Sequence, residues 1–401
     1  MGESVIIVSL PTYGGSGVVA AELGVALARR KWDVHFVSTA PPVRLALYAA
    51  DTRISERIHF HQVTSPAYAM FHHQPYVLSL AVKIAQVARH CKAPIIHAHY
   101  AIPHTIAAHL AREMLDGKAC VITTLHGTDI TLVGLDPSYR DIVTYALKVS
   151  DGVTAVSQFL LRATREEFPY AGPIEVIPNF VAPEVFHPHQ PQAAAIRQRF
   201  APDDRALLVH VSNYRPVKRA PAAVEVFGRV LTELPAHLLM IGEGPDRGLA
   251  EECAHSLGVG AHVSFLDNTL QLPPYLAAAD LMLLPSESES FGLAALEAMA
   301  CGTPVVASAI CGLPEVIDDG QDGILLPPQD LAGMAQAVLE LLQDRERLQE
   351  MSRAAAAKPG ARFPPQELVE RYAALYRRTS QCRAESRNGP ARAPAPPEEG
   401  S

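Results

Sequence analysis

The chain has 401 residues, of which 48% are hydrophobic and 19% are charged, and its formal net charge is −8. At roughly 150 residues per domain, this length predicts two or three domains, each able to bury a sizeable core. The acidic balance offers no basic surface that could grip a polyanion, so nucleic acid is excluded as a partner. A small anionic ligand in a local pocket stays open.

The sequence contains no segment typical of a membrane protein or an exported protein. No apolar run approaches the ~20 residues that span a bilayer. No Lys or Arg precedes the apolar stretch within residues 1–10, which therefore predicts a buried strand and not a signal peptide, and Ile6 stands where a myristoylation motif needs Ser or Thr. The six cysteines form no CxxC spacing, which favours reduced thiols. We expect a soluble, cytoplasmic protein, and a homodimer stays open.

The first half of the chain alternates short apolar runs with longer amphipathic stretches. The runs that predict strands are residues 5–9, 34–38, 58–62, 95–98, 120–124, 153–156 and 174–177. Helical patterns between them include residues 18–30, 77–90 and 105–115. Continuous apolar strands separated by helices predict a parallel sheet that is covered on both faces.

The second half repeats this plan. Residues 207–211, 238–241, 263–266, 281–284, 305–307 and 324–326 predict strands, and residues 219–234, 293–300 and 330–342 predict helices. The predicted fold class is therefore α/β, with two doubly wound, Rossmann-like domains. Ligands of such sheets bind beyond the carboxyl ends of the strands, and here two such ends can face each other across a cleft.

Composition divides the chain further. The Pro-rich, His/Gln-rich stretch before residue 205 predicts a hinge linker at 179–205, between an N-terminal domain (1–178) and a C-terminal domain (206–362). Residues 363–380 predict a last helix that returns to the N-terminal domain. The Pro/Ala/Glu-rich residues 381–401 predict a disordered tail.

The most informative segment is residues 285–304, which follows a predicted strand and opens a helix. It carries Glu289 and Glu297, eight residues apart; in a helix this spacing is about 12 Å at 1.5 Å per residue. That is about the span from the sugar to the ribose of an extended nucleotide diphosphosugar. Backbone N–H groups around Ser290 and Gly292, at the positive helix end, would meet the diphosphate between them. The plain alternative is two solvated glutamates beside an ordinary capped helix.

Three other clusters stand at predicted strand ends. Gly14 to Gly17 suit a tight turn with free N–H groups, so this turn is either structural or an anion site. His126 follows the predicted strand 120–124, where a ligand site is expected but where a structural histidine is also common. Arg215, Lys218 and Arg219 follow the first strand of the second domain, either as a solvated face or as cations that stabilise a leaving diphosphate.

A zinc site is a weaker possibility. His97, His99 and His104 form an H-x-H-x4-H set, but no carboxylate or Cys nearby completes four ligands, so we predict no metal there.

The segment 286–302 resembles the E-x7-E element of the retaining family-4 glycosyltransferases, which have the GT-B fold. The resemblance extends from residue 11 to the last predicted helix near residue 378. More narrowly, the stretches 14–17, 97–104, 123–131 and 211–219 are similar to the branch of N-acetylglucosaminyl L-malate synthases, which begin bacillithiol synthesis. Related transferases carry variants of the last three stretches too.

The resemblance implies a metal-independent enzyme without a cofactor, which moves N-acetylglucosamine from UDP-N-acetylglucosamine to the hydroxyl of L-malate with retention and releases UDP. The residues it implies at the reacting centre are His126, Lys218 and Glu289. Those it implies around the donor are Gly15, Asn213, Arg215, Lys218, Glu243, Ser290, Phe291, Gly292, Leu293 and Glu297. Because malate is a dianion, the expected acceptor residues are hydrogen-bond donors, namely Ser16, Tyr100, Thr124 and Arg215.

The sequence departs from the family at one position. Many members read Gly-Arg five residues before the lysine that corresponds to Lys218, and here Asn213 stands in that place. The group that assists Lys218 is therefore open, with Arg215 nearby. Other acceptors (an inositol phosphate or a lipid-linked sugar) and a GT-B UDP-N-acetylglucosamine epimerase stay as alternatives. A Rossmann dehydrogenase lacks its nicotinamide fingerprint here.

Overall fold

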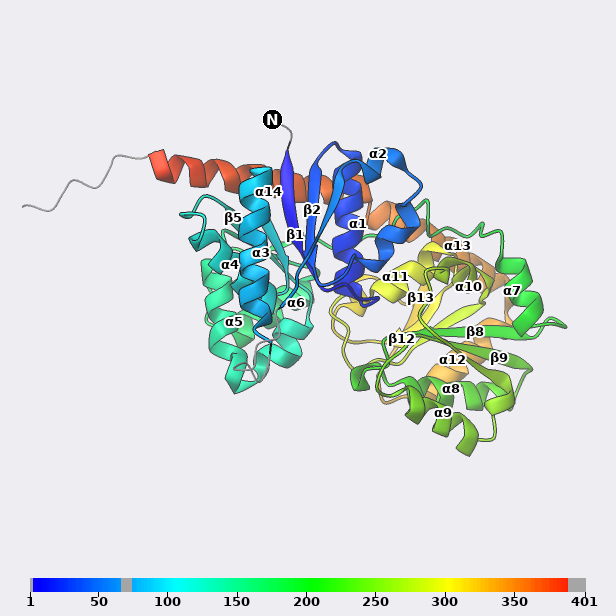
Figure 1. Ribbon diagram of the computed structural model, residues 1–401. Coiled ribbons are helices and arrows are strands. Elements are labelled where there is room, and N and C mark those ends of the chain that lie inside the picture. The colour runs from blue at the N-terminus through cyan, green and yellow to red at the C-terminus, as the bar shows by residue number, and fades with distance from the viewer. Residues whose placement is uncertain (1–2, 66–73, 389–401) are drawn as a thin grey trace, which may run out of the picture.

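The protein consists of two α/β domains side by side (Figure 1), as seen in a computed structural model that describes residues 3–65 and 74–388. Residues 389–401, the larger part of the predicted tail, lie outside the described residues, as do residues 1 and 2. Within the described residues, no helix has both the length and the apolar content needed to cross a bilayer.

The N-terminal domain is built on a seven-stranded parallel sheet in the order β3-β2-β1-β4-β5-β6-β7. The strands are β1 (Ser4–Val8), β2 (Asp33–Ser38), β3 (Ile58–Gln62), β4 (Ile95–His99), β5 (Cys120–Leu125), β6 (Gly152–Ala155) and β7 (Glu175–Val176). Successive side chains of β1 point to opposite faces. Val5 and Ile7 therefore belong to the core shared with helix α1 (Gly15–Arg29), whereas Ile6 and Val8 pack with helix α3 (Tyr76–Cys91). This sandwich explains why the strands are apolar throughout.

The remaining helices of this domain follow the strands in turn. They are α2 (Thr52–Ser55), α4 (Ile106–Glu113), α5 (Pro137–Val149) and α6 (Gln158–Glu167). Helix α4 packs on α3, and both lie over one face of the sheet.

The C-terminal domain repeats the arrangement with six parallel strands in the order β10-β9-β8-β11-β12-β13. They are β8 (Ala206–Val211), β9 (Ala236–Ile241), β10 (Val263–Leu266), β11 (Leu281–Leu284), β12 (Val305–Ser308) and β13 (Gly323–Leu326). The helices are α8 (Ala220–Leu231), α9 (Arg247–Ser256), α10 (Leu272–Ala278), α11 (Leu293–Ala300), α12 (Leu331–Gln343) and α13 (Arg345–Arg362). In each sheet the chain order reverses beside the first strand, between β1 and β4 and between β8 and β11. Ligands of such sheets bind at these points.

The predicted strands of both halves are all present, with ends that differ by no more than two residues. The fold class, two doubly wound domains, is confirmed.

Two segments differ from the prediction. The predicted linker 179–205 contains helix α7 (Ala193–Phe200), which packs on α10; Arg197 anchors it through bonds to the Ala278 carbonyl and Asp280, both at 3.0 Å. These contacts come from another part of the chain, so the polar local sequence did not predict the helix.

The last helix, α14 (Pro365–Asn388), is longer than predicted, so residues 381–388 are helical and not a disordered tail. It lies across the N-terminal domain (Figure 1), where Tyr376 packs against Trp32 and bonds to His97 at 2.6 Å. An ion pair between Arg383 and Asp151 holds its distal part. The added turns are thus stabilised by tertiary contacts that composition did not reveal.

Candidate active site

A cleft of about 770 Å³ lies between the carboxyl ends of the two sheets. Loops that follow β1, β4 and β5 line one side, and loops that follow β8, β9 and β11 line the other. The structure brings these predicted site residues together in its wall: Gly15, Ser16, Tyr100, His126, Asn213, Arg215, Lys218, Glu243, Glu289, Ser290, Phe291, Gly292, Leu293 and Glu297.

Two helix N-termini meet across this cleft. Helix α1 begins at Gly15, helix α11 begins at Leu293, and a Cβ on Gly15 would lie 4.0 Å from the Leu293 side chain. Gly292, which precedes α11, has φ +100°, and a Cβ there would lie 2.6 Å from Leu313. Glycine is therefore required at this turn. Two positive helix ends that face one gap favour an anion between them.

Lys218 and Glu289 form an ion pair at the base of the cleft, with 2.6 Å between Lys218 Nζ and Glu289 Oε1. Ser286 donates a further hydrogen bond to the same carboxylate, at 3.3 Å. Glu289 lies in the loop before α11, because the helix starts only at Leu293. The predicted helical spacing of about 12 Å between the two glutamates therefore does not apply, although both line the same cleft.

The neighbouring cation Arg219 points elsewhere. Its guanidinium contacts Glu287 and the Pro328 carbonyl, and it does not line the cleft. Of the three cations considered, Lys218 and Arg215 face the cleft.

Glu297 belongs to a buried ionic network that joins the two domains. Arg44, from the loop after β2, donates to Glu297 at 2.6 Å and lies 3.8 Å from Glu22 on α1. Tyr48 donates to the other oxygen of Glu22 at 2.6 Å. Burial raises the pKa of Glu22 to about 7, and burial also raises the pKa of Glu297, which Arg44 opposes. Arg44 escaped the sequence analysis; its position a few residues beyond a strand end was the available signal.

His126 is held rigidly beneath the cleft. Its Nε2 lies 2.9 Å from His99 Nδ1, so Nδ1 is the ring nitrogen left for a ligand. Burial lowers the pKa of His126 to about 3, so the ring is neutral. The buried Asp129 accepts hydrogen bonds from the backbone N–H groups of Ala101, His126 and Gly127, at 2.9, 3.2 and 3.0 Å, and so fixes this turn.

The other histidines considered as zinc ligands are hydrogen-bonded within the protein. His97 bonds to Tyr376 and Thr124, both at 2.6 Å, and His104 Nδ1 bonds to the His99 carbonyl at 2.5 Å. Together with His99 they form the support for His126.

Four polar residues form a second pocket beside the α1 N-terminus. Tyr100 packs its ring edgewise on His126 at 5.3 Å, and its hydroxyl hydrogen-bonds to Ser16 and Thr128. Arg215, from the opposite domain, donates to Thr128 Oγ1 at 3.3 Å. This arrangement presents hydroxyl and guanidinium donors, together with a positive helix end, to a small anion.

Thr124 is absent from this pocket, and its predicted role is wrong. It is fully buried on β5, where its hydroxyl bonds to His97 and to Thr154, both at 2.6 Å. Side chains alternate along a strand, so Thr124 points into the core beneath α14. Thr128, four residues later, takes the place expected for it.

The loop after β8 offers the unusual Asn213. Its Oδ1 is buried and has no hydrogen-bond partner in the described structure, so it can accept from a ligand. Gly242 and Gly244 pass so close to the Ser212 and Asn213 carbonyls that a Cβ would lie 1.9 Å away. Glu243, between these glycines, is exposed at the cleft margin.

Direct contacts between the domains hold the cleft closed. Ser290 donates to the His126 carbonyl at 2.6 Å, and Ser157 donates to the Ser290 carbonyl at 2.5 Å. Glu315 accepts from the N–H groups of Gln158 and Phe159 at the start of α6, at 2.8 and 2.7 Å. The two halves of the site therefore face each other at contact distance.

The chain matches two family models that together cover most of it. Residues 13–185 match glycosyltransferase family 4, and residues 191–358 match the glycosyl transferases group 1. It is 38% identical over 371 residues to the N-acetyl-alpha-D-glucosaminyl L-malate synthase of Bacillus anthracis, covering 92% of this chain and 95% of that protein. It is also 38% identical to the D-inositol 3-phosphate glycosyltransferase of Mycolicibacterium smegmatis, over 51% of this chain and 47% of that protein.

Solved structures with low sequence identity share the fold. Sucrose-phosphate synthase from Thermosynechococcus elongatus superposes with a TM-score of 0.77 at 22% identity, covering 95% of this chain and all of that one. Anabaena Alr3699/HepE in complex with UDP and glucose gives 0.76 at 20% identity, covering 92% and 98%.

Two Rossmann-like domains that face across an anion-binding cleft, with these matches, define a glycosyltransferase with the GT-B fold, a hexosyltransferase that joins a sugar donor to an acceptor. The chain belongs to glycosyltransferase family 4.

Proposed function

We propose that this enzyme transfers N-acetylglucosamine from UDP-N-acetylglucosamine to the hydroxyl of L-malate, with retention at the anomeric carbon, and releases UDP. The observation that carries the proposal is the match to the N-acetyl-alpha-D-glucosaminyl L-malate synthase, which extends over nearly the full length of both chains. The product would then enter bacillithiol synthesis.

The donor half of the cleft supports a nucleotide diphosphosugar. The N-terminus of α11 and Lys218 offer positive charge to the diphosphate, and Glu289 offers a carboxylate to sugar hydroxyls beside it. Glu297, deeper in α11, can accept from ribose hydroxyls once Arg44 shares it. The unpaired Oδ1 of Asn213 supplies one more acceptor for the nucleotide.

The acceptor half supports a small dianion. Ser16, Tyr100, Thr128 and Arg215 converge beside the N-terminus of α1, and none of them is a carboxylate that would repel malate. His126 borders both halves, because Tyr100 packs on its ring and its carbonyl accepts from Ser290 of the donor half.

In the proposed reaction the malate hydroxyl oxygen attacks the anomeric carbon from the side on which the diphosphate leaves. The bond from that carbon to the diphosphate oxygen breaks, its electron pair stays on the oxygen, and this oxygen takes the hydroxyl proton. Lys218 stabilises the charge that develops on the leaving group, and the neutral His126 orients the sugar. No protein base is needed, and retention follows from attack on the leaving-group side.

An acceptor panel tests the proposal. Enzyme and UDP-N-acetylglucosamine would be incubated with L-malate, D-malate, D-inositol 3-phosphate or no acceptor, with UDP release and product mass as readouts. We expect UDP release only with L-malate, and a product whose mass is malate plus one N-acetylglucosaminyl group. No such mass with L-malate would overturn the substrate assignment and leave the family unchanged.

A second acceptor class has one observation in its favour, the partial match to the D-inositol 3-phosphate glycosyltransferases. A product with inositol phosphate would support it. Conversion of UDP-N-acetylglucosamine without any acceptor would instead support an epimerase.

A further inference from the structure

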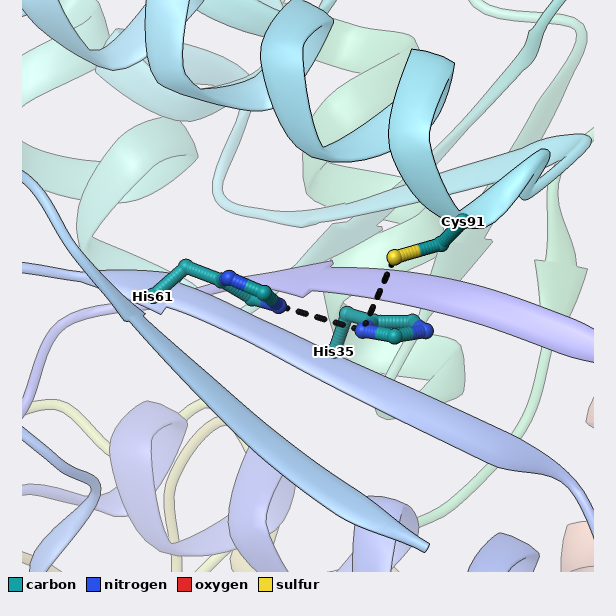
Figure 2. Close-up of side chains that lie close together, drawn as sticks. All are labelled: His35, His61 and Cys91. Carbon is teal, nitrogen blue, oxygen red and sulfur yellow. Dashed lines mark hydrogen bonds between the residues drawn. The ribbon is translucent and has the colours of Figure 1, made fainter.

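A cluster of metal-ligating side chains lies outside the cleft, on the α3 side of the N-terminal sheet (Figure 2). His35 lies on β2, His61 lies on the edge strand β3, and Cys91 is the last residue of α3. His61 pairs in register with Val37, two residues beyond His35, so both histidines face the same side. None of the three residues lines the cleft.

The ligand atoms are already spaced for one tetrahedral ion. His35 Nδ1 lies 3.1 Å from His61 Nε2 and 3.5 Å from Cys91 Sγ, and all three atoms lie within 4.8 Å of one another. Zinc bond lengths of ~2.0 Å to nitrogen and ~2.3 Å to sulfur place tetrahedral ligands about 3.4 Å apart for two nitrogens and about 3.6 Å apart for nitrogen and sulfur. A small inward shift of Cys91 or His61 therefore completes the geometry. In the rest of the described chain, no comparable group of three such residues occurs.

The electrostatic surroundings suit a cation. Burial lowers the pKa of His35 to about 4, and burial and the neighbouring His59 also lower the pKa of His61, so both rings are neutral and carry a lone pair. Cys91 ends α3, whose C-terminal dipole is negative, and Asp33 lies close enough to affect both His35 and Cys91. The positive groups that face the cluster are Lys83 and, when protonated, His90. The thiol of Cys91 is only half-buried, so an ion from solvent can reach it.

We propose that His35 Nδ1, His61 Nε2 and Cys91 Sγ bind one Zn²⁺ ion, with water at the fourth position. Binding replaces the two hydrogen bonds of the cluster by metal bonds and releases the thiol proton, so Zn²⁺ and a neutral site give a singly charged thiolate complex and H⁺. The ion would join the edge strand β3 to the end of α3. This site is independent of the proposed glycosyl transfer, which needs no metal.

Metal analysis of the untagged full chain tests the proposal. After equilibration with Zn²⁺ and removal of excess ion, we expect one zinc per chain and a melting temperature above that of the chelator-treated protein. Cys91→Ser and His61→Gln should each weaken zinc binding by at least about 100-fold and abolish the zinc-dependent rise in melting temperature. Both variants should keep transferase activity.

Matched controls come from the other domain. Cys253→Ser and His237→Ala remove a half-buried thiol and a half-buried histidine that bond to the Pro221 carbonyl and to Ser264. These variants should bind zinc like the wild type. Zinc below half an equivalent per chain, or equal binding by the Cys91 variant and its control, would overturn the site.

A measurement on the wild type guards against misfolded variants. Co²⁺ in place of Zn²⁺ should give the near-ultraviolet charge-transfer band of a cobalt thiolate. A Co²⁺ protein without this band would refute ligation by Cys91, whatever the variants do.

Discussion

Removal of the Lys218 ammonium is the sharpest test of how the cleft works. In the free enzyme this charge is paired with Glu289 at 2.6 Å, and the lysine side chain is only 19% exposed. When a diphosphate leaves, about one unit of charge develops on its oxygen. At ~4 Å and an effective dielectric constant of ~20, a neighbouring ammonium stabilises that charge by roughly 4 kcal/mol. Mutational losses of comparable contacts are about 3 kcal/mol, which corresponds to a fall in kcat of ~150-fold.

The assay is steady-state UDP release by Lys218→Ala and Lys218→Met, with kcat and KM measured for both substrates. Because the charge acts on the leaving group, kcat should fall far more than either KM rises. The matched control is Arg219→Ala, which removes an adjacent cation whose guanidinium lies on Glu287 and away from the cleft. This control should stay within a few-fold of the wild type. A Lys218→Ala enzyme with near-normal kcat, or an equal loss in both variants, would refute the assigned role.

Three further outcomes follow from the site. Glu297→Gln should raise the donor KM by about 10-fold or more, the loss of a charged hydrogen-bond acceptor, with little change in acceptor KM; an unchanged donor KM would contradict ribose binding. Thr128→Ala should raise the acceptor KM several-fold, whereas Thr124→Ala should lower the melting temperature at unchanged KM; the reverse result would place the acceptor elsewhere. The pKa of Glu22 is about 7 when folded, above its ordinary value of 4.5, so stability falls as pH rises through this range, and Glu22→Gln should remove up to about 3 kcal/mol of that fall. Denaturant unfolding at pH 4 and pH 8 measures it, and equal pH dependence in both proteins would contradict the prediction.

The ion pairs of the cleft also bear on how an anionic donor enters. Lys218 neutralises Glu289, and Arg44 neutralises Glu297, so neither carboxylate presents an unbalanced negative charge. Donor binding then exchanges carboxylate contacts of the two cations for phosphate and hydroxyl contacts. The loss on one side offsets the gain on the other, which favours interactions that strengthen only as charge develops.

Periodicity along the chain was sufficient for the fold class. Apolar runs of the right length predicted every strand, since a strand buried on both faces must be apolar throughout and this requirement is local. The same strands marked the site, because residues directly after a parallel strand lie at its carboxyl end. His126, Lys218 and Glu289 were predicted in this way, and all three line the cleft.

Tertiary structure decided what depends on which face a side chain takes and on partners distant in the sequence. Thr124 and Thr128 are both hydroxyl residues near one strand end, and only the pleat of β5 and the turn fixed by Asp129 send the first to the core and the second to the cleft. Arg44 meets Glu297 across 253 residues of sequence. His35, His61 and Cys91 have no metal-binding spacing along the chain. They meet because β2 and β3 pair in register and α3 ends above them, and sequence periodicity contains no information on such contacts.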